Sequence, residues 1–166
     1  MFYETAQYPF VQPLQAAWQT LRDELQALST SDFVKWPERS IYDGDWTVFA
    51  LYRLGEAISA HTALCPQTAA LLAQVPGLVN AGFSSLAPGT YIGPNVGYTQ
   101  EVLRCHVGLI TPENCAPRVD KEARGAVGPQ AHASSLTTPK SMRPGTAATR
   151  RAWCCYSTSN EIPQSR

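Results

Sequence analysis

Residues 93–110 read GPNVGYTQEVLRCHVGLI. The stretch begins with a Gly-Pro turn, and its second half is rich in Val, Leu and Ile, which is typical of a β-strand after a loop. Arg104 and His106 are two residues apart, so on a strand they point to one face while Cys105 points to the other. A guanidinium beside an imidazole can bind a carboxylate. The stretch therefore predicts a strand with Arg104 and His106 on one face, a pair that taken alone is more often a surface or ion-pair feature than an anion-binding site.

Other segments predict what this strand packs against. Apolar residues repeat at three- and four-residue steps over 14–28, which predicts an amphipathic helix, and a shorter helix is expected from Pro66 to the Pro-Gly turn at 76–77. The segments 46–52 and 78–86 have strand character between turns. Short strands separated by Gly/Pro turns favour a mainly β protein with flanking helices, of the jelly-roll type.

Composition limits the classes of function. The chain has 166 residues, enough for one domain, and 44% of them are apolar. Lys+Arg and Asp+Glu number 13 each, so we expect no nucleic-acid partner. No apolar run reaches the roughly 20 residues that span a bilayer, and the N-terminus has no signal-like pattern, so we expect no membrane. Five cysteines without a CxxC pair favour reduced thiols and a cytoplasmic protein.

The composition changes near residue 125. Residues 1–120 carry 6 Lys+Arg and 11 Asp+Glu, a net charge of −5, whereas residues 121–166 carry 7 and 2, a net charge of +5. The later segment has only four residues of the Val/Ile/Leu/Met/Phe set and no periodic pattern. We therefore expect residues 126–166 to be a loop or a disordered tail.

Four segments, one of which contains a shorter motif, together resemble one known family. They are WPERSIYDGDW (36–46), LCPQTAALLAQVPGLVNAGFSSLAPGT (64–90), FSSLAPGT within it (83–90), IGPNVGYT (92–99) and VLRCHVGLITPENC (102–115). In order and spacing they are similar to the aspartyl/asparaginyl β-hydroxylases, which are iron(II)- and 2-oxoglutarate-dependent dioxygenases on a double-stranded β-helix, a cupin-like jelly roll. The resemblance covers about residues 1–125, so the tail is expected to lie outside the family domain and to leave the barrel incomplete.

The resemblance implies roles for particular residues. Two histidines hold iron(II) in the family, and the first of them falls on Asn95. The family has a glycine where many such oxygenases have a carboxylate ligand, and Gly97 lies there. Arg104 matches the arginine near a 2-oxoglutarate carboxylate, His106 a second contact to this cosubstrate, and Ser84 a hydroxyl that also reaches it.

Several assignments leave alternatives open. A one-residue offset would put Ser85 in place of Ser84, because neighbours on a strand face opposite sides. Asn95 is either a weak amide ligand or simply a turn residue after Gly-Pro. His132 lies in an unpatterned polar stretch and is not expected to supply the missing ligand, and His61 is expected at the surface.

The tail can be tested against the genetic code. If each codon is read from its third base, the Trp-Cys-Cys-Tyr run at 153–156 must encode Val-Leu-Leu, and the Ser-Met pair at 141–142 can encode His. The shifted frame permits the family's expected ending, His-Glu-Ala-Trp-Asn and a Val/Leu-rich strand, in the right order. We therefore hypothesise that residues from about 126 onward are frame-shifted translation, with a strand edge within 78–119 left uncovered. Sequencing the encoding DNA tests this.

The implied activity is hydroxylation of an Asp or Asn side chain in a protein or peptide, or of a smaller acceptor, with iron(II), 2-oxoglutarate and O2. Asn95 and the missing second histidine predict that this chain is impaired. The alternative is a non-catalytic remnant that binds a 2-oxoglutarate-like anion. A third interpretation is a cupin-like domain that binds a small molecule and is unrelated to oxygenases.

Overall fold

The computed structural model describes residues 2–3, 5–92, 102–111, 118–119, 122–123, 134–137, 142–143 and 152–159. The α-helices are α1 (Val11–Ala16), α2 (Trp18–Ala27), α3 (Ser59–Leu64) and α4 (Pro66–Leu72), and the 3-10 turns are η1 (Thr5–Gln7), η2 (Thr30–Asp32) and η3 (Arg39–Ile41). The strands are β1 (Phe2–Tyr3), β2 (Val34–Lys35), β3 (Tyr42–Asp43), β4 (Trp46–Arg53), β5 (Glu56–Ala57), β6 (Leu78–Leu86), β7 (Tyr91–Ile92), β8 (Leu103–Ile110), β9 (Arg118–Val119), β10 (Glu122–Ala123), β11 (Ser134–Thr137), β12 (Met142–Arg143) and β13 (Ala152–Ser159).

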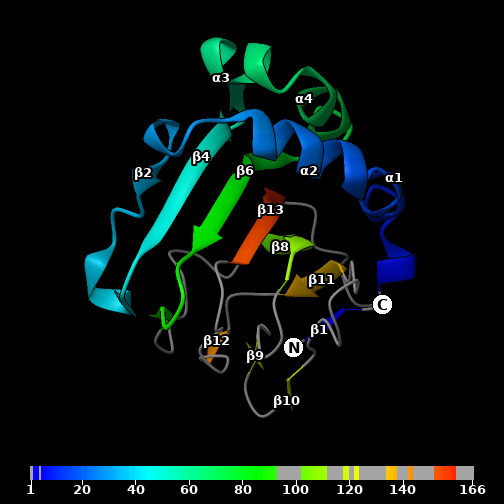
Figure 1. Ribbon diagram of the computed structural model, residues 1–166. Helices are drawn as coiled ribbons and strands as arrows, with labels where there is room; N and C mark the ends of the chain where they lie inside the picture. The colour runs from blue at the N-terminus through cyan, green and yellow to red at the C-terminus, as the bar shows by residue number, and fades with distance from the viewer. Residues whose placement is uncertain are drawn as a thin grey trace.

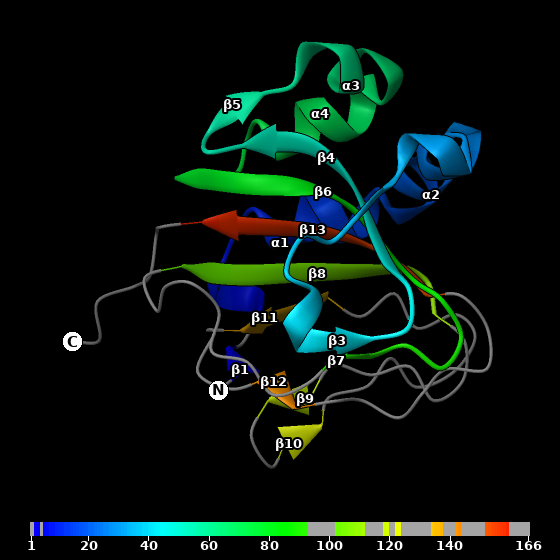
Figure 2. The same cartoon turned by 90° about the vertical axis from the view of Figure 1, so that its left-hand side faces the viewer.

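One antiparallel sheet organises the described residues. Its order is β1-β11-β8-β13-β6-β4-β2, and β5 pairs with β4, which makes eight strands (Figure 1). After a quarter turn, the long strands β4, β6, β13 and β8 are seen side by side in this order (Figure 2). Two smaller sheets, β3-β7 and β10-β9-β12, lie in the lower part of that view. The expectation of a mainly β fold with flanking helices is confirmed.

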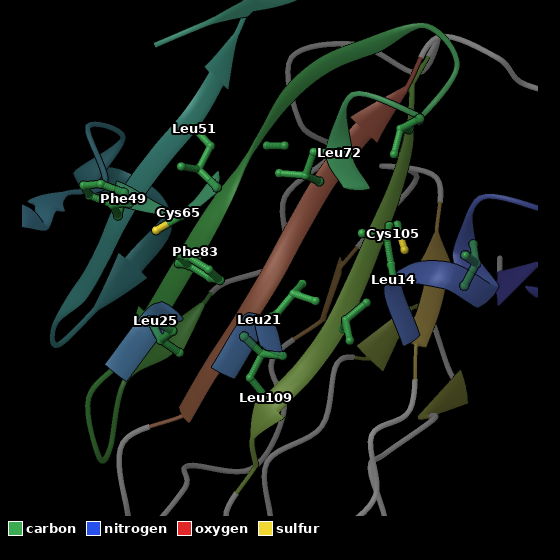
Figure 3. Close-up of a cluster of buried hydrophobic side chains, with 14 of the residues drawn as sticks. Leu14, Leu21, Leu25, Phe49, Leu51, Cys65, Leu72, Phe83, Cys105 and Leu109 are labelled. Atoms are coloured by element: carbon green, nitrogen blue, oxygen red, sulfur yellow. The ribbon is translucent and has the colours of Figure 1, made fainter. Parts of the chain in front are cut away.

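The helices cover one face of the large sheet and create the core there. Leu14, Leu21 and Leu25 point from α1 and α2 onto the strands, where they meet Phe83 and Leu109 among others (Figure 3). Every second residue of β8 belongs to this cluster, which is the alternation that a half-covered strand requires. The opposite face of the sheet is thereby left available for a site, and we call it the inner face.

A carboxylate joins α2 to the start of α4. Glu24 accepts hydrogen bonds from the backbone N–H groups of Gln67 (2.9 Å) and Thr68 (2.8 Å) and from the Thr68 hydroxyl (2.6 Å). These N–H groups have no partner within the helix, so an anion here satisfies them. Burial, and secondarily Glu24, raise the pKa of the Cys65 thiol to about 12, so this cysteine stays protonated.

The sequence predictions for the first 110 residues are largely confirmed. The helix expected over 14–28 is interrupted at Ala17, which separates α1 from α2. β4, β6 and β8 lie within a residue of their expected bounds. The short helix α3 was not predicted, because Ser59–Leu64 has too few apolar residues to show a helical stripe.

The expectation that residues 126–166 lack regular structure is wrong at β11, β12 and β13. The expected uncovered edge is also wrong for β6 and β8, because β13 pairs with both of them along most of their length. Strand pairing uses main-chain N–H and C=O groups, which every residue except proline supplies. A segment without strand periodicity can therefore fill a gap between two edges.

Candidate functional site

The alternation along β8 confirms that Arg104 and His106 share a face. Leu103, Cys105 and Val107 are buried in the core beneath the helices, whereas Arg104 and His106 are half-buried on the inner face. Figure 3 labels Cys105 among the core side chains. Strand alternation puts the predicted pair on the other side of β8. The polar pair thus belongs to the face that the helices do not cover.

Strand register places Ser84 on the same face. Cys154 of β13 opposes both Ser84 on β6 and Gly108 on β8, and Thr158 opposes Arg104. Residues opposite one another in antiparallel strands share a face, and so do residues two or four apart on one strand. Ser84 and Arg104 are separated by two strand spacings and four residues, or ~16 Å between Cα atoms. They lie at opposite ends of a row and are not direct neighbours.

The choice between Ser84 and Ser85 follows from the same alternation. Phe83 belongs to the core under the helices, and Ser85, two residues on, shares its face. Ser84 faces the other way, where its Oγ accepts a hydrogen bond from the indole Nε1 of Trp46 at 2.9 Å. Only Ser84 of the two serines is therefore on the inner face.

Burial sets the charge of the pair on β8. The pKa of His106 falls to about 4, first because of burial and second because of the Arg104 charge. Burial also lowers the pKa of Arg104, while the negative charge of Glu38 opposes this shift. At neutral pH the site thus presents a guanidinium next to a neutral imidazole, which has one N–H to donate.

Aromatic side chains of the segment 36–46 also lie at the site, although no role there was expected for any of them from the sequence. Trp36 and Trp46 stack with ring centroids 4.6 Å apart and planes 10° apart. Tyr42 meets Trp46 edge-on at 5.4 Å, and Arg39 lies over the Tyr42 ring. The cluster of three aromatic residues in eleven positions was a visible signal, but nothing in the sequence connected it with Ser84.

Three other residues considered in the sequence do not add to the described site. Asn95 and His132 fall outside the described residues, so the suggested iron position remains a prediction. His61 was expected at the surface, but it is half-buried: its Nδ1 donates to the Ala50 carbonyl oxygen at 2.6 Å and its ring stacks on Phe49. Its role is structural.

The described residues fit the two family cofactors differently. Guanidinium, neutral imidazole and hydroxyl are all hydrogen-bond donors, the set that a dicarboxylate such as 2-oxoglutarate requires. For iron, the described part of the chain contains no group of three or more His, Cys, Asp or Glu side chains that could hold a metal ion. Those residues therefore do not provide an iron site by themselves.

The family model described as aspartyl/asparaginyl beta-hydroxylase matches residues 15–127. The chain belongs to the aspartyl/asparaginyl β-hydroxylase family. It is 31% identical over 131 residues to an ornithine lipid ester-linked acyl 2-hydroxylase of Rhizobium tropici, a match that covers 72% of this chain and 47% of that protein. It is 30% identical over 130 residues to the human aspartyl/asparaginyl beta-hydroxylase, covering 73% of this chain and 17% of that protein. This family member thus spans less than half the length of these relatives.

A solved structure supports the fold assignment. The prolyl-4-hydroxylase of Pseudomonas putida superposes with a TM-score of 0.53 at 12% identity, covering 88% of this chain and 86% of that one. At this identity the similarity shows the fold alone, which is a jelly roll. Among the described residues of the hydroxylase-family chain, no helix is both long and apolar enough to cross a membrane.

Proposed function

We propose that this β-hydroxylase-family protein binds 2-oxoglutarate, or a dicarboxylate like it, on the inner face through Arg104, His106 and Ser84, and that its oxidative chemistry is impaired. One observation carries the binding part: one charged and two neutral hydrogen-bond donors lie in a row on one face, with the Cα atoms of Arg104 and Ser84 ~16 Å apart. A cation at one end and a hydroxyl at the other suit an elongated molecule with an acceptor group at each end.

Each of the three residues has a distinct part in binding. Arg104 offers its planar fork of N–H groups to one carboxylate, and partial burial strengthens that charge-assisted contact. His106 adds a neutral N–H donor, because its pKa of about 4 leaves it uncharged at neutral pH. Ser84 donates its hydroxyl proton at the far end. Glu38, whose charge acts on Arg104, tempers the positive potential when no anion is bound.

The proposed impairment rests on the metal ligands. Asn95 stands where the resemblance puts the first iron histidine, and no second histidine follows in the family's context. An amide oxygen is a far weaker iron(II) ligand than an imidazole. Loss of the histidine ligands should abolish metal binding and not merely change its strength. We therefore favour a remnant that binds the cosubstrate without hydroxylation.

The place of β13 is the place where the frame-shift hypothesis expects an apolar strand. Position 155 opposes Phe83 on one side and Val107 on the other, and both neighbours are buried. The shifted frame reads Val-Leu-Leu across 153–156, where an apolar strand would complete the core. We propose that the family domain comprises residues 1–125 together with a C-terminal strand that another frame encodes, and that the protein is cytoplasmic, as its cysteine content suggests.

A second candidate is an active hydroxylase, and the names of the relatives favour it. One is an acyl 2-hydroxylase of ornithine lipids and another an aspartyl/asparaginyl beta-hydroxylase. For this chain the acceptor would be an Asp or Asn side chain in a protein or peptide, or a smaller molecule, with O2 as the other substrate.

The test has two parts. Calorimetric titration of the full chain with 2-oxoglutarate should give saturable binding that Arg104→Gln weakens at least tenfold, while Arg53→Gln, at an exposed position at the end of β4, leaves it unchanged. Absence of binding by the unmodified chain would disprove the proposed function. Iron(II), O2 and 2-oxoglutarate should then give no succinate; succinate release by the unmodified chain would establish the active hydroxylase instead. Release that appears only after Asn95→His with the restored frame would confirm the impairment.

A further inference from the structure

The hydrogen bond between Trp46 and Ser84 connects two strands across the inner face. Trp46 begins β4 and opposes Leu86 on β6, so its side chain lies on the face that holds Ser84. Its Nε1–H donates to Ser84 Oγ at 2.9 Å. Among the described residues this is the one side-chain hydrogen bond of Ser84, which is only 7% exposed.

Neighbouring rings fix the orientation of the Trp46 indole. One face of Trp46 stacks on Trp36, and the Tyr42 ring approaches edge-on. The Tyr42 hydroxyl donates to the Trp36 carbonyl oxygen at 2.9 Å and accepts from Arg39 at 2.8 Å, so it is itself held in place. The Trp46 N–H therefore points at Ser84 before any ligand arrives. Ligand binding then loses no free energy to ordering this side chain.

We propose that Trp46 is a positioning residue that sets the hydrogen-bond polarity of Ser84, an inference that rests on the proposed dicarboxylate site. A serine hydroxyl has one proton and two lone pairs. Because the indole N–H occupies one lone pair, the hydroxyl proton is left free for donation to a ligand on the inner face. Ser84 thus presents a donor, which selects a carboxylate or another acceptor at that end of the ligand and disfavours an ammonium or amide N–H.

A pair of matched variants isolates this effect. Trp46→Phe keeps an aromatic ring in the stack and removes the N–H that contacts Ser84. Trp36→Phe makes the same change in the partner ring, whose buried Nε1 has no hydrogen-bond partner among the described residues. Trp46→Phe should weaken 2-oxoglutarate binding about tenfold, the scale of one hydrogen bond to a charged group, while Trp36→Phe should change it less than twofold.

A double-mutant cycle separates positioning from a general structural role. In a Ser84→Ala background, Trp46→Phe should cause no further loss of 2-oxoglutarate affinity, because its whole effect acts through the hydroxyl. If the Trp46→Phe variant does not fold, the indole N–H resonances of the ¹⁵N-labelled unmodified chain are followed by NMR instead. The Trp46 signal should then shift on 2-oxoglutarate addition, and the Trp36 signal should stay.

The outcomes distinguish this inference from the proposed function. The role of Trp46 is overturned if Trp46→Phe binds 2-oxoglutarate as tightly as the unmodified chain does. It is also overturned if Trp46→Phe causes the same tenfold loss in the Ser84→Ala background. Either result leaves the dicarboxylate site intact. An unmodified chain that binds no 2-oxoglutarate overturns both. The positioning role is established if Trp46→Phe weakens 2-oxoglutarate binding tenfold, Trp36→Phe does not, and Trp46→Phe causes no further loss in the Ser84→Ala background.

Discussion

Replacing His106 with Gln should remove a pH dependence of folding that the buried imidazole causes. The unfolded chain takes up a proton on this residue near its ordinary pKa of 6.5, whereas the folded protein does so only near pH 4. Between these values the unfolded state binds more protons, so the free energy of unfolding falls as the pH falls. The contribution is fully present above pH 6.5 and is lost by about pH 4. At about 1.4 kcal/mol per pKa unit, the drop amounts to about 3 kcal/mol.

The assay is urea unfolding followed by circular dichroism at constant ionic strength, from pH 7.5 down to pH 4. Carboxylates also titrate in this range, so the quantity to follow is the difference in unfolding free energy between the unmodified chain and His106→Gln. This difference should fall by about 3 kcal/mol over the range, most steeply below pH 6.5. A difference that stays constant with pH would refute the reasoning, because it would mean that His106 titrates alike in both states.

Three further substitutions test how the scaffold holds the site. Glu24→Ala should destabilise the fold by about 2–3 kcal/mol in urea unfolding, since it leaves the N–H groups at the start of α4 without their acceptor, whereas Asp23→Ala next to it should cost less than about 0.5 kcal/mol. Leu54→Asn should stabilise the protein by about 1 kcal/mol, because Leu54 is 77% exposed and adopts a φ of 52° in the β4-β5 turn, where Asn before Gly is favoured; no change in the melting temperature would count against this. Gly82→Ala should prevent soluble folding, because its Cβ would collide with the Phe49 carbonyl oxygen; a soluble variant with an unchanged melting temperature would contradict it.

The amino-acid pattern by itself determined much of this fold. The i, i+3, i+4 spacing over 14–28 dictates a helix with one apolar side, and the two-residue spacing of Arg104 and His106 dictates a shared face on any strand. Both inferences depend only on local backbone geometry; the shared face is confirmed, and the helix is confirmed apart from its interruption at Ala17. The family resemblance likewise follows from short segments in fixed order, and the matched region 15–127 agrees with it.

Other features depend on which segments meet in space, and a linear pattern does not contain that information. The burial of Phe83 in the core shows that Ser84, rather than Ser85, shares a face with Arg104, and the pairing of β13 with both β6 and β8 shows how far apart the two lie. The donation from Trp46 to Ser84 joins residues 38 positions apart, and only the β4-β6 register brings them together. The depressed pKa of His106 likewise arises from burial by distant segments and from the Arg104 charge. Local sequence thus determined the elements and their faces, while tertiary packing decided their neighbours, and hydrogen bonding and pKa shifts depend on neighbours.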